Sequence, residues 1–557
     1  MRSEPKHPLL DKVERQFLDG KMNRRDFIRF STLLGVGAGT AYALAGIADP
    51  FAINAAQAAA NGGTVRIAQR VHPVDSPHTF AWAEPSNITR QVCEYLTRTG
   101  QDNITRPYLL EKWEPSADLK TWTLYIRPGV VWRKGSPLTA DQVIWNLKRV
   151  LDEKIGSSML GLMKAYMLKE VDKGEKDDSG NPKMSLEIWD ANAIEKVDDH
   201  TVRLNLAEAQ LAVPEHLFHY PMAILDPAED GKFGIGSNGT GAFELVEFEA
   251  GRKAVLKART EHWHTVPSLD TLQFIDTGDD ATAVVAALAS KQVDGAYEVD
   301  VTQKPALDKI DSLQIYEVAT SQTAVIHGKC TRKPFDDAKV RLAMRLAVDA
   351  AQVMSLAEGD TGVVGEHHHV CPIHPEYAKL PPFVRDVARA KSLLAEAGYP
   401  DGIDSTLTLP AEPTWQSVAA QVMVQQWAEA NIRIKLNVIP SAQWWDVWDK
   451  VDLGYTVWYH RPLGFMTLSL AYRTGVPWNA PEWSDKEFDT LLTQAEGTVD
   501  VEERRKVMEK IETIMQERGP VVQPFWRSVL TFYDKKVQGF KMHPTSFVFG
   551  EELSIKA

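Results

Sequence analysis

Short segments of two different hydrophobic periods alternate along the chain after residue 60. In five of them β-branched and polar residues alternate, and this period of two predicts strands at residues 62–68, 121–127, 201–206, 253–258 and 433–439. Between the strands, apolar residues recur every three or four positions, which is typical of helices with one buried face. The interleaving predicts an α/β or α+β fold with several sheets.

Polar residues mark where three of the predicted helices begin. Thr139 and Gln142 form the two halves of a capping box, and Asp386 and Asp500 can each accept a hydrogen bond from a first helical turn. A glycine after the last apolar position ends the second and third helices. The apolar stripes that follow these caps are Val143, Leu147, Val150 and Leu151; Ala390, Leu393, Leu394 and Ala397; and Val507, Ile511, Ile514 and Met515.

The length and charge of the chain limit the possible classes of protein. A chain of 557 residues is too long for one core, because single cores stop growing near about 250–300 residues, so we expect two or three domains. With 44% hydrophobic and 25% charged residues the composition is that of a globular protein. The net charge of −13 argues against nucleic acid as a partner, since phosphate binding needs a basic face.

Residues 1–60, called the leader below, have the pattern of an export signal. The run Asn23-Arg24-Arg25-Asp26-Phe27-Ile28 resembles the twin-arginine motif, with Arg24 and Arg25 as the pair. A weakly apolar stretch follows at 31–48, and small residues at 54–60 offer cleavage sites. The alternative is a membrane anchor, for which the glycine and threonine content of the stretch is unfavourable.

We therefore expect export by the twin-arginine translocase and a mature chain that begins near residues 59–61. No second run of about 18 apolar residues occurs, as a spanning helix would need. The mature protein is thus expected to be soluble and periplasmic. Its three cysteines, Cys93, Cys330 and Cys371, form no disulfide framework, and at most one pair could bridge.

Sequence motifs of catalysis and nucleotide binding are not convincing in this chain. The run Gly234-Ile235-Gly236-Ser237-Asn238-Gly239 matches the dinucleotide fingerprint, but no strand pattern precedes it and a strand pattern, not a helix, follows. No P-loop, GxSxG or HExxH motif is present. We therefore expect no enzymatic activity and no cofactor.

Five blocks in a fixed order carry a family resemblance. The chain resembles the family 5 solute-binding proteins of ABC importers, which include dipeptide, oligopeptide and nickel binders, and the resemblance extends from residue 61 to residue 557. The blocks that carry it are residues 108–143, 239–243, 287–294, 333–341 and 390–402.

The resemblance implies an α/β clamp of two lobes and three domains, with ligand bound between the lobes. Domain I would comprise residues 61–100, 199–320 and 521–557, domain II residues 101–198, and domain III residues 321–520. The hinge would lie near 321 and 520. The implied function is that of a monomeric periplasmic binding component that delivers a peptide-like or small acidic solute to a membrane permease and its ATPase. Alternatives are a metal-chelate binder of the nickel type or, in other classes, a periplasmic enzyme or chaperone.

The segment Trp458-Tyr459-His460-Arg461 indicates the kind of ligand. In peptide binders of the family the equivalent stretch reads Trp-x-x-Asp, and the aspartate pairs with the α-amino group of the peptide. Here Arg461 stands at the aspartate position. A guanidinium suits a carboxylate or phosphate and not an ammonium group, so we expect an acidic ligand. Two alternatives stay open: the pattern is displaced by one or two residues, or Arg461 pairs with a carboxylate of the protein.

Further candidates for ligand contact are histidines and tryptophans. The resemblance places the first loop of domain I, with His72, His78 and Trp82, against the ligand. In the run 366–374, His367, His368 and His369 stand near Cys371 and His374. They could hold a soft metal, line the cleft or lie on the surface; we expect them to line the cleft without a metal, because neighbouring side chains on an extended loop point in different directions. Trp415 is the last candidate.

Overall fold

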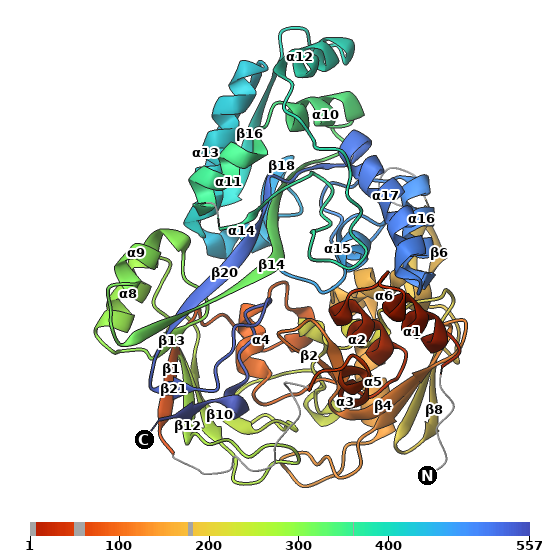
Figure 1. Cartoon of the computed structure of the whole chain (residues 1–557), viewed down its shortest axis with the longest axis vertical. Helices are drawn as coiled ribbons and strands as arrows, with labels where there is room; N and C mark the ends of the chain where they lie inside the picture. Colours follow the sequence, from red (N-terminus) through yellow and green to blue (C-terminus); the bar gives the residue numbers. More distant parts are fainter. Residues whose placement is uncertain (1–6, 49–61, 177–181, 360, 557) are drawn as a thin grey trace.

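The computed structural model describes residues 7–48, 62–176, 182–359 and 361–556. The chain forms two bodies, one above the other in Figure 1, that are joined by two long strands, β14 (Leu313–Gly328) and β20 (Phe525–Asp534). We call the lower body, with β1–β13 and the C-terminal segment from Val537, lobe one. The upper body, with α10–α17 and β15–β18, is lobe two.

One mixed sheet runs through both lobes because β14 belongs to both. Its first half pairs antiparallel with β20 over Leu313–Ala319, and its second half pairs with β18 from Thr323 to Gly328. The register shifts between Ala319 and Gln322, at the passage from one lobe to the other. The strand order is β10-β11-β12-β1-β13-β20-β14-β18-β16-β17. The remaining bounds are β10 Phe243–Glu249, β11 Lys253–Ala258, β12 Thr271–Ile275, β1 Thr64–Ala68, β13 Gly295–Ala296, β18 Leu453–Trp458, β16 Ile403–Pro410, β17 Ile432–Ile439, β19 Val521–Val522 and β15 Val363–Val364.

Smaller antiparallel sheets complete lobe one. The largest has the order β4-β5-β9-β8. Its strands, and those of the three two-stranded sheets, are β4 Leu110–Pro115, β5 Thr121–Ile126, β9 Thr201–Asn205, β8 Ile194–Asp198, β2 Thr97–Thr99, β3 Thr105–Pro107, β6 Leu168–Lys176, β7 Pro182–Ile188, β21 Val537–Gln538 and β22 Ser554–Ile555. All five strands predicted from the alternating pattern are confirmed within one or two residues at each end. The run at 234–239, which matches the dinucleotide fingerprint, is followed by strand β10 and not by a helix, as expected.

The predicted helix caps are confirmed. Thr139 and Gln142 form a capping box at α5, Asp386 Oδ1 accepts from the backbone N–H of Arg389 at 2.8 Å, and Asp500 caps α17. The longer helices of the two lobes are α5 Ala140–Val150, α6 Met159–Met167, α8 Ala281–Ala289, α10 Ala338–Leu346, α11 Ala350–Glu358, α12 Val387–Glu396, α13 Thr414–Glu429, α14 Ser441–Val447, α15 Gly464–Ala471, α16 Lys486–Gly497 and α17 Val501–Arg518. The short ones are α4 Glu84–Thr89, α7 Val213–His216 and α9 Lys304–Leu307.

Buried apolar side chains gather in three clusters, as the length of the chain requires. One fills lobe one and continues under α15–α17, a second fills the sheet and helices of lobe two around Leu407, and a third lies under α8 around Leu288. All three cysteines are free thiols, and Cys93 and Cys371 are buried.

Part of the leader packs on the body of the protein. Its helices are α1 (Leu10–Leu18), α2 (Arg24–Leu33) and α3 (Ala38–Leu44), drawn in dark red beside β4 in Figure 1. The Trp113 indole N–H of β4 donates to the carbonyl of Leu33 at 3.0 Å. Over the described ranges, no helix is long and apolar enough to cross a membrane. The expected cleavage tract at 54–60 lies outside the described residues.

Candidate ligand-binding cleft

Two adjoining cavities lie between the lobes, with volumes of about 280 and 420 Å³. Tyr220 of lobe one and Arg461 of lobe two line both. The other residues around the smaller cavity are Ala81, Trp445, Trp448, Thr456, Val457, Trp458, Tyr459 and Trp478. Around the larger one they are Thr99, Asn103, Glu215, Phe218, His219, His460, Pro462, Met466, His543, Thr545 and Phe547. Each cavity is thus built from both lobes, so relative motion of the lobes would open it.

Aromatic rings form the wall of the smaller cavity. Trp82 of lobe one stacks on Trp445 of lobe two, with ring centroids 5.2 Å apart and planes inclined by 16°. On the side of lobe two, Trp448, Trp458 and Trp478 meet edge to face, with centroid distances of 5.9–6.1 Å. Tryptophan offers a large apolar surface and one N–H donor. The wall can therefore bury the apolar part of an organic molecule.

Arg461 is a buried cation without a counter-charge. Its side chain is 3% exposed, its Nη1 donates to the carbonyl of Tyr459 at 2.7 Å, and its Nε has no hydrogen-bond partner. Among the described residues, the ionisable side chain that interacts with its guanidinium is that of Tyr220 and not a carboxylate, so the alternative of a carboxylate partner from the protein finds no support in the described structure. Burial lowers the pKa of Arg461, yet arginine stays protonated in proteins. A buried unpaired charge is unfavourable until a partner arrives.

His460 links the two lobes directly. It lies one residue before Arg461, and its Nε2 donates to Oδ1 of Asn103 in lobe one at 2.7 Å. The opposite ring nitrogen, Nδ1, accepts from the backbone N–H of Ser321 at 3.0 Å, at the register shift of β14. Of the candidates from the sequence, Trp458, Tyr459, His460 and Arg461 therefore lie together in the cleft.

Of the candidates in the first loop of domain I, Trp82 and His72 lie at the cleft and His78 does not. Trp82 contributes to the wall, and His72 lies edge-on to it, with centroids 5.1 Å apart and Nε2 3.3 Å from Glu84. His78 is instead fully buried inside lobe one, where its Nε2 donates to the carbonyl of Ala223 at 2.9 Å and burial lowers its pKa to about 4. It lines neither cavity.

The three neighbouring histidines of lobe two diverge. His367 accepts from the backbone N–H of Gln523 at 3.0 Å, His368 lies 3.1 Å from Glu366, and His369 shares a 2.7 Å hydrogen bond with the Tyr472 hydroxyl. The ring of His369 also packs on Trp458 at 5.9 Å. Burial lowers the pKa of each. They lie behind the cleft and do not line either cavity, and no group of three or more possible metal ligands occurs in the part of the chain that the structure describes.

Trp415 also lies away from the cleft. It is 1% exposed in the core of lobe two, where its ring packs on Phe525 and lies 4.5 Å from the Arg527 guanidinium. The sequence reasoning did not single out several residues that do line the cleft: Asn103, Glu215, Tyr220, Trp445, Trp448, Trp478 and His543. The tryptophan-rich run at 444–448 was a usable signal for two of them. The lobe one residues carried no signal, because they come together only through the fold.

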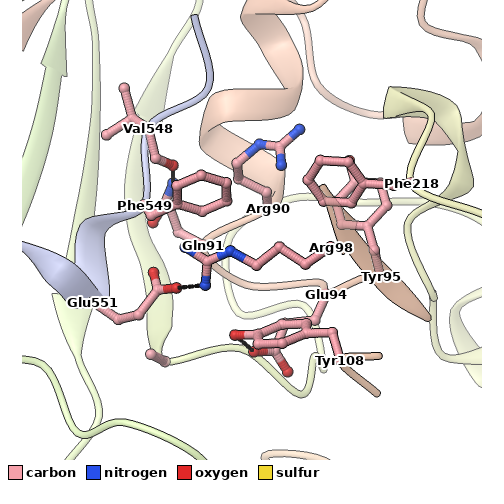
Figure 2. Close-up of a pocket in the computed structure, with 11 residues that line it drawn as sticks. Arg90, Gln91, Glu94, Tyr95, Arg98, Tyr108, Phe218, Val548, Phe549 and Glu551 are labelled. Atoms are coloured by element: carbon pink, nitrogen blue, oxygen red, sulfur yellow. Dashed lines mark hydrogen bonds and ion pairs between the residues drawn. The ribbon is translucent and has the colours of Figure 1, made fainter. Parts of the chain in front are cut away.

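A third cavity, of about 360 Å³, lies wholly within lobe one (Figure 2). Its charged residues have partners in the lobe: Arg98 Nη1 donates to Glu551 at 2.9 Å, and Glu94 accepts from the Tyr108 hydroxyl at 2.8 Å. Arg90 donates to the Ser86 hydroxyl at 3.1 Å and lies 3.6 Å from the Phe547 ring centroid. The cavity has no residue of lobe two, so closure of the lobes does not form it.

Fold and site together define a class: a two-lobed clamp that encloses a small organic ligand between lobes joined by paired strands. Comparison with known proteins gives the family. Residues 105–475 match the model of the bacterial extracellular solute-binding proteins, family 5. The chain belongs to this family, whose members bind a solute and deliver it to an ABC permease.

Individual relatives agree with this assignment. The dipeptide-binding protein DppE of Bacillus subtilis is 24% identical over 494 residues, 85% of this chain and 87% of its own. The glutathione-binding protein GsiB of Escherichia coli is 25% identical over 86% of this chain and 91% of its own. The structure of AgaA from A. tumefaciens R10 in complex with agropinic acid superposes with a TM-score of 0.77 at 22% identity, over 89% of this chain and 99% of its own. The chain is accordingly an exported, periplasmic substrate-binding protein.

Proposed function

We propose that this protein captures an organic solute with an acidic group and that Arg461 binds that group. The observation that carries the proposal is the burial of an unpaired guanidinium between two cavities that both lobes enclose. An anion bound there would form charge-assisted hydrogen bonds with a fork of N–H donors. The tryptophan wall would bury the apolar part of the same molecule.

The names of the relatives are consistent with a ligand of this kind. Dipeptides, glutathione and agropinic acid, which these names mention, all carry a carboxyl group. They differ in size and in their other groups, so the carboxylate is the feature they share. The ligand is therefore proposed as a peptide-like or smaller organic acid.

We further infer that the protein carries out no reaction of its own. The support for this inference is the family to which the chain belongs, which is one of solute-binding proteins. The work of transport would come from the permease and its ATPase. The twin-arginine route, removal of the leader and a monomeric state belong to the same proposal.

The test begins with the ligand itself. Protein purified from the periplasm without denaturation is analysed by native mass spectrometry, and the retained molecule is identified. Calorimetry then compares its affinity for the unaltered protein, Arg461→Gln and the surface control Arg389→Gln. We expect an acidic molecule and about a hundredfold loss of affinity in Arg461→Gln alone, because truncating one partner of a buried charge pair has effects of this size. A retained ligand without an acidic group would contradict the proposal.

A further inference from the structure

Helix α2 of the leader is attached to lobe one. The carbonyl of Leu33 accepts from the Trp113 indole, as described above, and Nε of Arg29 donates to the carbonyl of Asn103 at 3.0 Å. All residues of the helix from 26 to 33 are buried. This part of the leader is therefore packed into the body of the protein and does not lie loosely on its surface.

The leader also contacts lobe two. Lys12 of α1 forms an ion pair at 2.8 Å with Asp500, the residue that caps α17. Phe30 of α2 covers Arg504 of α17: the guanidinium lies 4.6 Å from the ring centroid, and both side chains are fully buried. Nε and Nη2 of Arg504 have no hydrogen-bond partner in the described structure, so the face of the Phe30 ring is one of the groups that stabilise this charge.

Helix α1 connects these contacts, although it lies before the twin-arginine pattern. Phe17 of α1 stacks on Phe27 of α2, with ring centroids 4.4 Å apart and planes inclined by 17°. Leu10 and Val13 of α1 are buried as well. An export signal needs the arginine pair and the apolar stretch after it, and α1 belongs to neither. Its stacked ring and its ion pair join α2 to lobe two.

We propose that α1 and α2 form a strap that holds the clamp closed in the precursor, with Asp500 and Arg504 as its docking point on lobe two. The inference rests on the proposed function in one respect, since it takes residues 1–60 as a leader that is removed. The strap is attached to two bodies that move apart when the clamp opens, so opening would break one set of its contacts. Contacts made only in the closed arrangement shift the equilibrium towards that arrangement.

The precursor and the exported protein would then differ in solute binding although their clefts are the same. A solute enters the cleft when the lobes are apart, so the apparent affinity of the precursor falls with the fraction of open molecules. Arg24 and Arg25 stay exposed while the rest of α2 is buried, so an export receptor can reach them on the closed clamp. Removal of the leader would release the lobes after export.

The distance between the lobes of solute-free protein tests the strap. Spin labels are attached to Lys257→Cys of lobe one and Lys435→Cys of lobe two, both at exposed positions, in a Cys330→Ser background because Cys330 is the partly exposed natural thiol. Double electron–electron resonance is recorded on the full-length chain and on the exported chain without the leader, both dialysed exhaustively. We expect one short distance in the full-length chain and an additional, longer one in the exported chain.

Variants of the full-length chain test the docking point on lobe two. Phe30→Ala should raise the fraction of the longer distance about tenfold, because a buried cation–π contact has effects of this size. Lys12→Glu should raise it about twofold, as expected for an exposed ion pair. The matched controls are Leu18→Ala, whose side chain is 80% exposed, and Lys21→Glu, whose ion pair with Asp19 lies within the leader. If Phe30→Ala prevents folding, Phe30→Leu removes the ring and keeps most of the volume.

Identical distance distributions in the full-length and exported chains would overturn the inference. So would a Phe30 variant that is no more open than Leu18→Ala, or a Lys12→Glu variant that is no more open than Lys21→Glu. These measurements use no solute and leave Arg461 unaltered, so their failure does not affect the calorimetric test of an acidic ligand. Removal of the leader in the cell is checked separately, by N-terminal sequencing of the exported protein.

Discussion

The indole rings of Trp82 and Trp445 stack across the cleft at 5.2 Å, one from each lobe. This contact and the hydrogen bond from His460 to Asn103 can exist only when the lobes are together. The described structure is therefore the closed arrangement of the clamp. Ligand stabilises such an arrangement to the extent that it binds the closed state better than the open one.

Trp445→Ala should weaken closure. Losing one aromatic pair costs about 0.5–1.5 kcal/mol beyond the area it buries, so we expect ligand affinity to fall about threefold to tenfold. Small-angle scattering should show a smaller contraction on ligand addition than for the unaltered protein. Trp189→Ala is the control, since Trp189 donates to the carbonyl of Asn205 inside lobe one. A full contraction with unchanged affinity in Trp445→Ala would show that the stacked pair has no role in closure.

Arg461→Met should abolish ligand binding without lowering the stability of the ligand-free protein. The substitution removes a buried, unpaired cation and keeps most of the side-chain volume, so the ligand-free protein should unfold at the same temperature or higher. Binding of an acidic ligand should be lost. Thermal denaturation with and without ligand measures both effects. A marked fall in the melting temperature of the ligand-free variant would reveal a protein partner for Arg461.

The stability of the full-length chain should depend on the protonation of Glu215. Burial raises the pKa of this carboxyl from 4.5 to about 7. A raised pKa means that the folded state binds this proton more tightly than the unfolded state does. The stabilisation that the proton gives the folded state is therefore fully present below pH 4.5 and is lost as the pH rises through 7. The loss is on the order of 3 kcal/mol.

The measurement compares melting temperatures of the unaltered chain and Glu215→Gln between pH 5 and pH 8. The variant should become the more stable of the two as the pH rises. Buried histidines such as His78 act in the opposite direction, because their lowered pKa destabilises the folded state in acid. These histidines are present in both proteins, so the difference between the two curves of melting temperature against pH reports the effect of Glu215 alone. Parallel curves would contradict the raised pKa.

Metal binding at the histidine run should be weak or absent. His367, His368 and His369 each have a different protein partner, and ligation would require breaking those contacts. Calorimetric titration of chelator-treated protein with Ni²⁺ or Zn²⁺ measures this. A stoichiometric, tight isotherm that disappears in the His367→Ala/His369→Ala double variant would show a metal site after all.

The twin-arginine assignment predicts that replacing Arg24 and Arg25 together by lysine retains the precursor in the cytoplasm. Both side chains are exposed on the first turn of α2, where a receptor can reach them in the folded precursor. Cell fractionation shows the location, and N-terminal sequencing of the unaltered exported protein should give a start near residues 59–61. Normal export of the lysine variant would exclude this route.

Local features of the structure were predictable because their causes are local. The alternation of residues 253–258 determines which face of a strand is apolar, and Thr139 with Gln142 satisfies the first turn of a helix wherever that helix packs. The order of five sequence blocks predicted the family and therefore the clamp. The division into three domains at the stated boundaries stays a prediction. For Arg461, the departure from the family pattern was visible in the sequence alone.

Other parts of the site depended on contacts between distant segments. His78 and Trp82 are four residues apart, yet one lies in the core of lobe one and the other meets Trp445 across the cleft. Trp415 and Trp458 look alike in sequence, but of the two only Trp458, the last residue of β18, lines a cavity. Glu215 acquires its raised pKa from burial, and the fold places it in the same cavity lining as Asn103. The sequence by itself determined which segments form helices and strands, because those choices depend on near neighbours. The tertiary structure decided which side chains share one desolvated space, because burial and charge pairing depend on groups hundreds of residues apart.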